Sequence, residues 1–167
     1  VETHAVVPEN HRRRSRVLVI ANTVAQAEKV HARLAKSMVR ESFTVKLVTG
    51  RFRADDAPTA KDLGESNRIT VSTQVVEAGV DFTCDLLVSE LAPWPMLTQR
   101  LGRLNRDGSS RENALAVVIV PSKTTASGTE YGSDGSRKIY GEAPMDAVGA
   151  GLVSAYASAQ EGATVYT

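Results

Sequence analysis

The sequence contains little cysteine and has no excess of charge of one sign. A single cysteine, Cys84, cannot form an internal disulfide, and three histidines without a Cys-x-x-Cys pair do not make a zinc site. The 20 Lys and Arg residues nearly balance the 19 Asp and Glu residues, which leaves a net charge of +1. The overall charge therefore gives no general attraction to nucleic acid or membranes, and any anion site must come from local placement of basic residues.

Long hydrophobic runs are also absent. The longest apolar stretch, at 114–121, is far shorter than the roughly 18 residues that span a bilayer, and no basic and then apolar signal segment opens the chain. We therefore expect a cytoplasmic protein without a membrane partner. The 167 residues, 42% of them hydrophobic, suit one compact globular core. Because the first residue is Val1 and not Met, we expect a piece of a longer protein.

Segments with strand and helix patterns alternate along the first three quarters of the chain. A continuous apolar run that is typical of a buried parallel strand lies at 16–21. Further strand patterns lie at 43–49, 68–73, 85–90 and 114–121, and the last of these is also expected to be buried. Helical patterns lie at 24–38, after a capping box at Thr23 and Gln26, and at 55–63 and 96–105. This alternation predicts an α/β fold with an open, mainly parallel sheet flanked by helices.

The composition changes after Pro121. Seven of the 12 glycines lie beyond it, and the Ser-, Thr- and Gly-rich stretch 122–136 predicts a mobile loop. Small residues at 147–159 predict a helix whose thin apolar face needs a neighbour. We therefore expect an N-terminal lead-in at 1–15, the α/β domain at 16–121, and a flexible Gly/Ser-rich loop with a C-terminal extension at 122–167.

The segment QRLGRLNR, from Gln99 to Arg106, carries the strongest chemical signal. On a helix, Gln99, Arg103 and Arg106 are spaced i, i+4 and i+7 and share one polar stripe. Paired guanidiniums suit phosphate oxygens and stabilise the negative charge of a transferring phosphoryl group. A solvated basic helix face is the alternative that the spacing alone leaves open.

The segment VSTQVVEAGVD, at 71–81, follows a predicted strand. Loops at the carboxyl ends of parallel strands are where open α/β sheets bind ligands. Here Thr73 can donate to phosphate, Asp81 can accept from sugar hydroxyls, and Gly79 gives the loop conformational freedom. An ordinary connection between two strands is the alternative.

Two single residues have more than one interpretation. Trp94, between two prolines at a predicted helix start, is interpreted as a packing anchor, with stacking on a nucleic-acid base as the alternative. Cys84 heads an apolar strand, which predicts a buried, inert thiol.

Taken together, TQVVEAGVD and QRLGRLNR resemble motifs V and VI of the second RecA-like domain of superfamily 2 helicases. The longer stretch ELAPWPMLTQRLGRLNRDG is most similar to the CRISPR-associated helicase-nucleases of type I systems, and VLVIANTVAQAEKV resembles their motif IV region. The resemblance covers residues 16–121 well and 139–147 weakly. It implies a RecA-like sheet and a place for each motif in an ATP-dependent enzyme.

The resemblance also implies roles for single residues in ATP binding. Arg103 and Arg106 would reach the ATP γ-phosphate with Gln99 beside it, and Gly79 and Asp81 would lie near the ribose and phosphates. The sequence has neither GxxxxGK nor an Asp-Glu dipeptide, so the phosphate loop and the Mg²⁺-binding acid must come from an N-terminal lobe. We therefore expect ATP with Mg²⁺ as cofactor, no metal site in this chain, and no ATP hydrolysis by the chain alone.

On the nucleic-acid side, the resemblance implies that Asn22, Thr23 and Thr73 contact the phosphate backbone of single-stranded DNA, near a helix N-terminus that suits anions. The implied partners are single-stranded DNA, an N-terminal RecA-like lobe, an HD-type nuclease domain and a CRISPR surveillance complex. We thus expect the C-terminal lobe of an ATP-dependent DNA helicase or translocase in CRISPR interference. The alternatives are a non-catalytic nucleic-acid-binding or docking module, and the lobe of a restriction or repair translocase.

Overall fold

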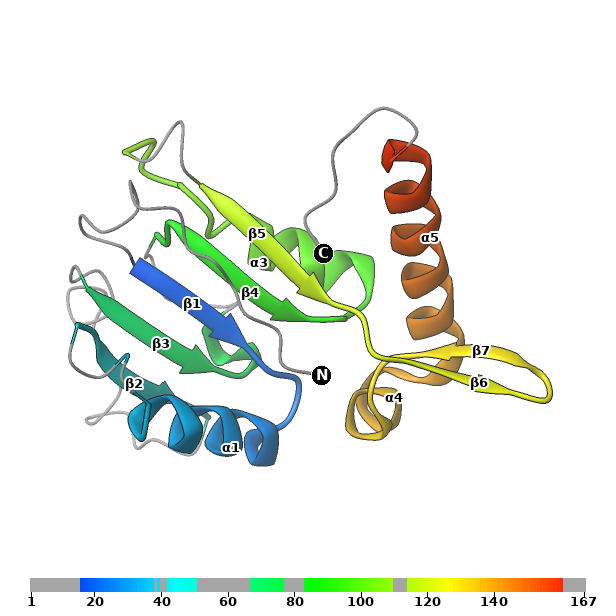
Figure 1. The fold of residues 1–167 in the computed structure, drawn as a ribbon, viewed down its shortest axis with the longest axis horizontal. Coiled ribbons are helices and arrows are strands. Elements are labelled where there is room, and N and C mark those ends of the chain that lie inside the picture. Colours follow the sequence, from blue (N-terminus) through cyan, green and yellow to red (C-terminus); the bar gives the residue numbers. More distant parts are fainter. Residues whose placement is uncertain are drawn as a thin grey trace.

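A computed structural model describes residues 16–37, 39, 42–50, 67–76, 83–109 and 114–160. Within these ranges, a five-stranded sheet is flanked by helices, and a two-stranded hairpin and two further helices follow it in the chain (Figure 1). The predicted α/β class with a mainly parallel sheet is confirmed. The predicted lead-in at 1–15 and the predicted helix at 55–63 lie outside the described residues.

All five strands of the main sheet run parallel. They are β1 (Arg16–Ile20), β2 (Thr44–Val48), β3 (Arg68–Ser72), β4 (Leu86–Glu90) and β5 (Leu115–Ile119), in the spatial order β2-β3-β1-β4-β5. In the centre, Val19 of β1 pairs with Val71 of β3 and Val88 of β4. Because the strands are parallel, their carboxyl ends share one edge of the sheet, which we call the carboxyl edge, and their starts share the opposite, amino edge.

Helices α1 (Val24–Ala35) and α3 (Trp94–Leu101) cover opposite faces of the sheet (Figure 1). The predicted cap of α1 is present, because Thr23 Oγ1 accepts a hydrogen bond of 3.1 Å from the backbone N–H of Gln26. A short 3₁₀ helix, η4 (Gln74–Val76), follows β3. Apolar clusters on both faces bury the central strands, which explains the continuous hydrophobic sequence of β1 after Arg16.

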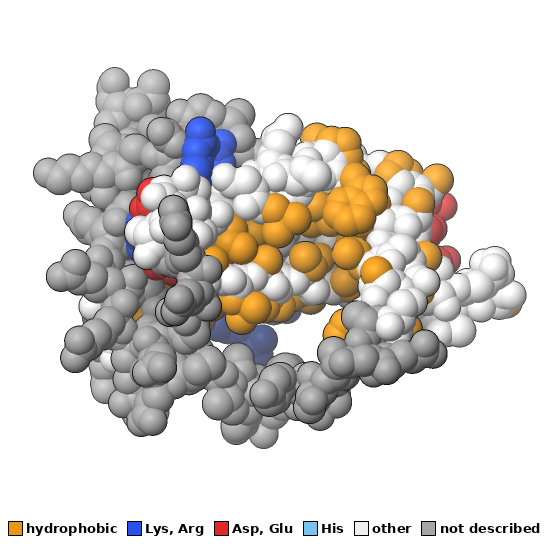
Figure 2. Space-filling model, turned by 90° about the horizontal axis from the view of Figure 1, so that it is seen from above, with side chains coloured by type: hydrophobic (Ala, Val, Ile, Leu, Met, Phe, Trp, Pro, Cys, Tyr) orange, Lys and Arg blue, Asp and Glu red, His pale blue; other side chains and the backbone are white. Residues whose placement is uncertain are grey.

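Strand β5 differs from the predicted fully buried strand. It is the last strand in the sheet order, and its alternate side chains Leu115, Val117 and Ile119 are 53%, 41% and 51% exposed. One face of an edge strand is thus uncovered among the described residues, although its sequence is as apolar as that of β1. Figure 2, seen from above, shows hydrophobic side chains gathered on the surface of the molecule.

The predicted mobile loop at 122–136 is wrong. Strands β6 (Ser122–Thr125) and β7 (Gly128–Tyr131) pair as an antiparallel hairpin, and α4 (Asp134–Tyr140) follows at once. Gly128 occupies the hairpin turn with φ of +134°, a conformation that glycine adopts without a steric penalty. The Ser- and Thr-rich composition that indicated a loop is thus compatible with a solvent-exposed hairpin, because threonine also favours strands.

Helix α5 (Glu142–Gln160) contains the predicted small-residue helix and has the neighbours it needs. Met145 and Val148 are buried in one apolar cluster with Leu91, Ala92 and Leu97, which follow β4 or belong to α3. The C-terminal elements therefore pack on the same core as the sheet. Among the helices that the structure describes, none has the length and hydrophobicity required to cross a membrane.

Candidate functional site

Helix α3 ends sooner than its sequence pattern predicts. The pattern predicts a helix to Asn105, but α3 ends at Leu101 and Gly102 is its C-cap. Two tight turns follow, with hydrogen bonds from the N–H of Arg103 to the carbonyl of Arg100 and from Leu104 to Leu101, both 3.0 Å. The polar stripe that predicted a shared helix face for Gln99, Arg103 and Arg106 is therefore wrong, because both arginines lie beyond the helix.

The segment from Arg103 to Arg106 instead lies along the residues that lead into β4. The N–H of Cys84 donates to the Arg103 carbonyl at 2.9 Å, and the N–H of Asn105 donates to the Cys84 carbonyl at 2.8 Å. The N–H of Arg106 donates to Thr83 Oγ1 at 2.9 Å. Backbone pairing with a distant segment thus ends the helix and fixes the positions of the two arginines.

The predicted ATP-contacting residues differ in exposure. Gln99 and Arg106 are exposed, whereas Arg103 is only 9% exposed. Gly79 and Asp81 lie outside the described residues, but Thr83 follows Asp81 by two positions. The arginine segment is therefore held against the part of the chain that directly follows the predicted nucleotide-contacting loop, at the amino edge of the sheet.

An ion-pair cluster that sequence reasoning missed secures this segment. Arg16, the first residue of β1, contacts Asp85 Oδ1 at 2.7 Å and Asp107 Oδ2 at 2.8 Å. The bonds from the Arg16 guanidinium and from Ser109 hold the pKa of Asp107 well below its usual range. Asp107, the residue after Arg106, is thus ionised, and its ion pair with Arg16 holds this part of the chain at the start of β1. The two partners of Arg16 lie 69 and 91 residues away in the sequence, so no local pattern indicates these ion pairs.

The predicted nucleic-acid contacts gather at the carboxyl edge. Thr23 is partly exposed at the start of α1, Thr73 is 5% exposed after β3, and Asn22 is 1% exposed. The Asn22 side chain donates to the Leu91 carbonyl at 2.6 Å and to Ser136 Oγ at 2.8 Å. Of the three, Thr23 has the most accessible surface, while the amide of Asn22 is used inside the fold. Arg103 and Arg106 thus lie at the amino edge of the sheet, whereas Asn22, Thr23 and Thr73 lie at the carboxyl edge.

A buried arginine that the sequence did not single out organises the carboxyl edge. Arg100 is 0% exposed, and its guanidinium donates to Ser89 Oγ and the Glu90 carbonyl, each at 2.9 Å. It also donates to Asn22 Oδ1 at 3.0 Å and to the Tyr140 hydroxyl at 3.2 Å. The sequence did contain a signal, because position 100 lies three residues after the buried Leu97 and so shares the buried face of α3.

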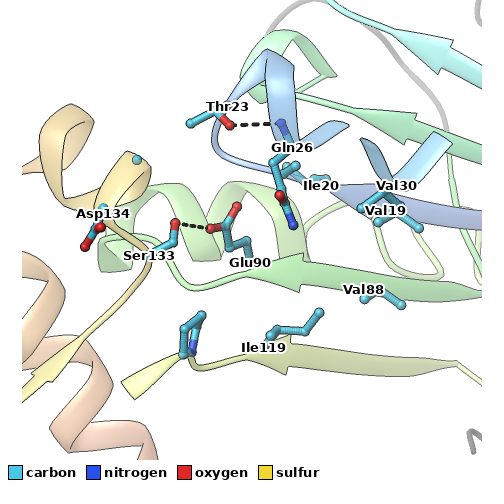
Figure 3. A pocket seen from close by; sticks show the side chains of 13 residues that line it. Val19, Ile20, Thr23, Gln26, Val30, Val88, Glu90, Ile119, Ser133 and Asp134 are labelled. Carbon is cyan, nitrogen blue, oxygen red and sulfur yellow. Dashed lines mark hydrogen bonds between the residues drawn. The ribbon is translucent and has the colours of Figure 1, made fainter. Parts of the chain in front are cut away.

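A cavity of about 370 Å³ opens at this edge between α1, β4, β5 and the start of α4 (Figure 3). Thr23, Gln26 and Glu90 line it, and the Glu90 carboxylate accepts hydrogen bonds from Ser133 Oγ at 2.6 Å and from the Asn22 N–H at 2.9 Å. The walls from the sheet are apolar. A carboxylate inside the cavity opposes a phosphate there, so a nucleic-acid backbone fits better along its rim, where Thr23 lies.

The described residues offer no metal centre. No group of three or more His, Cys, Asp or Glu side chains in these ranges could hold a metal ion. The one cysteine, Cys84, is 1% exposed, and burial raises its pKa to about 12. The predicted burial of the thiol is thus confirmed, and its inertness stays a prediction. Trp94, by contrast, is 52% exposed, so its interpretation as a packing anchor is wrong.

Comparison with known proteins identifies the family. A family model described as CRISPR-associated nuclease/helicase Cas3, C-terminal, matches residues 13–109. A putative CRISPR-associated nuclease/helicase Cas3 from Myxococcus xanthus is 36% identical over 112 residues, which cover 63% of this chain and 14% of that protein. The chain therefore spans a small part of the length of such a relative.

Solved structures agree on the fold. A crystal structure of T. fusca Cas3 with AMPPNP has a TM-score of 0.69 at 23% identity and covers 84% of this chain and 18% of that chain. A chain of a structure titled as a CRISPR RNA-guided surveillance complex before nicking has a TM-score of 0.64 at 24% identity, over 90% of this chain and 20% of its own. The predicted RecA-like fold is confirmed. Since the family model matches more than half of its residues, the chain belongs to the Cas3 nuclease/helicase family and is a C-terminal helicase lobe of that family.

Proposed function

We propose that this chain works as the C-terminal lobe of an ATP-dependent DNA helicase or translocase in CRISPR interference. ATP binds between this lobe and an N-terminal RecA-like lobe. The observation that supports the proposal is the pairing of the Arg103–Arg106 segment with Thr83 and Cys84. The pairing holds the arginine segment against Thr83, two positions after Asp81 in the sequence, which supports ATP contacts from both segments.

On the ATP side, Arg106 and Arg103 supply guanidiniums to the γ-phosphate, with Gln99 beside them. Arg106 is exposed and is the group that stabilises the negative charge of the transferring phosphoryl group. Gly79 and Asp81 contact the ribose and phosphates. The N-terminal lobe holds Mg²⁺, which neutralises phosphate charge when bound, and it also supplies the phosphate loop that this sequence lacks.

On the DNA side, Thr23, Thr73 and Asn22 face one strand at the carboxyl edge. Thr23 caps α1, so the positive end of a 12-residue helix points in the same direction. Asn22 acts there by holding the start of α1, because its amide bonds inside the fold. Contacts of this kind go to phosphates and are insensitive to base sequence, so binding weakens as salt rises.

ATP turnover opens and closes the two lobes on the strand and moves it. The further partners that we propose are a CRISPR surveillance complex and an HD-type nuclease domain. Support for the first is the similarity of this fold to a chain in a structure with that title. Support for both is the membership of the chain in a family described as nuclease/helicase.

The test is ATP turnover in the two-lobe enzyme with single-stranded DNA. Arg106→Ala should lower kcat by about 10³-fold, the effect of losing an arginine that contacts the transferred phosphoryl group. Arg106→Lys should restore little, because an ammonium cannot reproduce the planar fork of a guanidinium. Arg33→Ala, which removes an exposed guanidinium from the last turn of α1, is the matched control and should retain full turnover.

Two further measurements complete this test. The chain without an N-terminal lobe should show no turnover above background, because the phosphate loop is missing from its sequence. DNA binding by Arg106→Ala in the absence of nucleotide should match the unmodified enzyme. Turnover that is kept while DNA binding is lost would contradict the proposal, since Arg106 would then face the strand.

A further inference from the structure

Four residues from four separate segments form a closed ring of hydrogen bonds at the carboxyl edge, with Asn22 taking part through both its backbone carbonyl and its side chain. They are Asn22 after β1, Gln74 in η4, Arg100 in α3 and Tyr140 at the end of α4, and we call them the polar hub. Motifs IV, V and VI do not include Tyr140, which lies in the weakly similar stretch 139–147 of the C-terminal extension. Its place in the hub connects that extension to all three motif regions.

The Tyr140 hydroxyl oxygen closes the ring. It accepts from Gln74 Nε2 at 2.8 Å and from the Arg100 guanidinium at 3.2 Å. Gln74 Nε2 also donates to the Asn22 carbonyl at 3.2 Å, and Arg100 also donates to Asn22 Oδ1 at 3.0 Å. With Arg100 and Asn22 almost fully buried, these bonds lie where the local dielectric is low and each is strengthened by the others.

Helix α4 is held firmly enough for Tyr140 to act as a fixed point. Ser133 and Ser136 donate to Glu90 Oε1 at 2.6 Å and 2.7 Å, which attaches the first turn of α4 to the end of β4. The ring of Tyr140 packs against the apolar cluster of α5 and α3. The hydroxyl therefore has a defined position relative to the sheet.

Each partner of Tyr140 adjoins a residue of the proposed function. Gln74 directly follows Thr73 and begins the stretch that leads to Gly79, whereas Arg100 accepts, through its carbonyl, the bond that starts the turn to Arg103. We propose that Tyr140 is a positioning residue of the helicase lobe. Its hydroxyl sets Gln74 and Arg100 relative to each other and so links the DNA-contacting edge to the ATP-contacting segment.

This inference rests on the proposed function, and its test uses the same two-lobe enzyme. Tyr140→Phe removes the hydroxyl and keeps the ring. Tyr156→Phe removes a hydroxyl from a tyrosine of α5 that is 57% exposed, and is the matched control. The measurements are kcat and the KM for ATP at saturating single-stranded DNA, together with the thermal unfolding midpoint.

For Tyr140→Phe we expect kcat to fall about tenfold, within the range that misplaced supporting groups produce, while the KM for ATP changes less than twofold. The unfolding midpoint should stay within a few degrees of the unmodified enzyme, since the variant removes one hydroxyl and keeps the packed ring. Tyr156→Phe should behave as the unmodified enzyme. Turnover in Tyr140→Phe equal to that in Tyr156→Phe would overturn the positioning role.

A double-mutant comparison separates positioning from a general loss of structure. If Tyr140 acts through Gln74, then Tyr140→Phe should lower kcat by less than about threefold in a Gln74→Ala background. If the two substitutions lower kcat independently, so that the fold-decrease of the double variant equals the product of the single ones, the positioning role is overturned. An unmodified enzyme without DNA-stimulated turnover would overturn the proposed function and this role together, whereas normal turnover with no effect of Tyr140→Phe overturns the role alone.

Discussion

Replacing Arg100 with alanine should destabilise the fold more than any change at its exposed neighbours. The guanidinium is 0% exposed and donates to Ser89, the Glu90 carbonyl, Asn22 and Tyr140. Its loss removes donors from acceptors in β4, in the segment after β1 and in α4 at once.

Four contributions set the size of the effect, and one of them opposes the other three. A hydrogen bond from a charged donor contributes about 1.5–3 kcal/mol, and an acceptor left buried without a partner loses about 1–3 kcal/mol. Burial of the guanidinium itself costs several kcal/mol, which the alanine variant recovers. The cavity left by the long side chain adds to the loss. We expect a net decrease of about 3–5 kcal/mol in the free energy of unfolding, as for other broken buried networks.

Urea or thermal unfolding of the 167-residue chain measures this decrease. At about 2–4 °C per kcal/mol for a chain of this size, Arg100→Ala should lower the midpoint by roughly 10 °C. Arg100→Lys should lose about half as much, because one ammonium reaches only some of the acceptors. Gln99→Ala, the exposed neighbour on α3, should stay within about 0.5 kcal/mol. A loss for Arg100→Ala no larger than that for Gln99→Ala would refute the reasoning.

Three further outcomes are expected. Since its pKa is about 12, the Cys84 thiol should react with iodoacetamide at pH 8 only after unfolding, and rapid labelling of the native chain, followed by mass spectrometry, would contradict this. Gly149→Ala should lower the free energy of unfolding by about 1–3 kcal/mol, because its Cβ would overlap the side chain of Tyr131, whereas Gly151→Ala, with nothing within 4 Å, should raise it by up to about 1 kcal/mol; equal thermal midpoints would count against this. The pKa of Asp107 is lowered in the folded chain, so its contribution to the free energy of unfolding is full above about pH 4 and is lost as acid protonates the carboxylate. The free energy of unfolding of Asp107→Asn, measured against pH, should therefore fall less steeply with acid than that of the unmodified chain.

The sheet could be predicted from the sequence because its signals are local. The strands that begin at Arg16, Thr44, Arg68 and Leu86 each start within one residue of the predicted runs. Continuous apolar runs indicate burial on both faces, and the cap at Thr23 sets the start of α1. None of these signals requires knowledge of a distant partner.

The end of α3 could not be predicted in the same way. Its helical spacing continues to Arg106, but the chain leaves the helix at Gly102 to pair with Cys84, which lies almost 20 residues earlier. Backbone bonds to that distant segment replace the helical bonds, and Leu104 packs in the core from an extended position. Helix periodicity measures only local preference, so a tertiary contact of this kind overrides it.

The hydrogen-bond partners of the charged and polar residues could not be predicted from the sequence either. Arg100 reaches Asn22 across 78 positions, and Asn22 reaches Ser136 across 114. A sequence pattern identifies a residue that will be buried, but it does not identify which acceptors meet its charge. Trp94 shows the converse, because its position between prolines correctly indicated a helix start and still misjudged its exposure.

Strand β4 connects the two edges where the proposed contacts lie. At its start, Asp85 holds Arg16 and the neighbouring Cys84 pairs with the arginine segment; at its end, Glu90 holds the first turn of α4 through both serines and offers its carbonyl to Arg100. A strand that is hydrogen-bonded on both sides, to β1 and β5, does not stretch or bend easily. Helix α3 begins four residues after Glu90, its Arg100 donates to the Glu90 carbonyl, and the turns after it bring Arg103 to Cys84 at the start of β4. This helix and its turns thus contact both ends of β4 and form one route by which the proposed DNA and ATP contacts are coupled within this lobe.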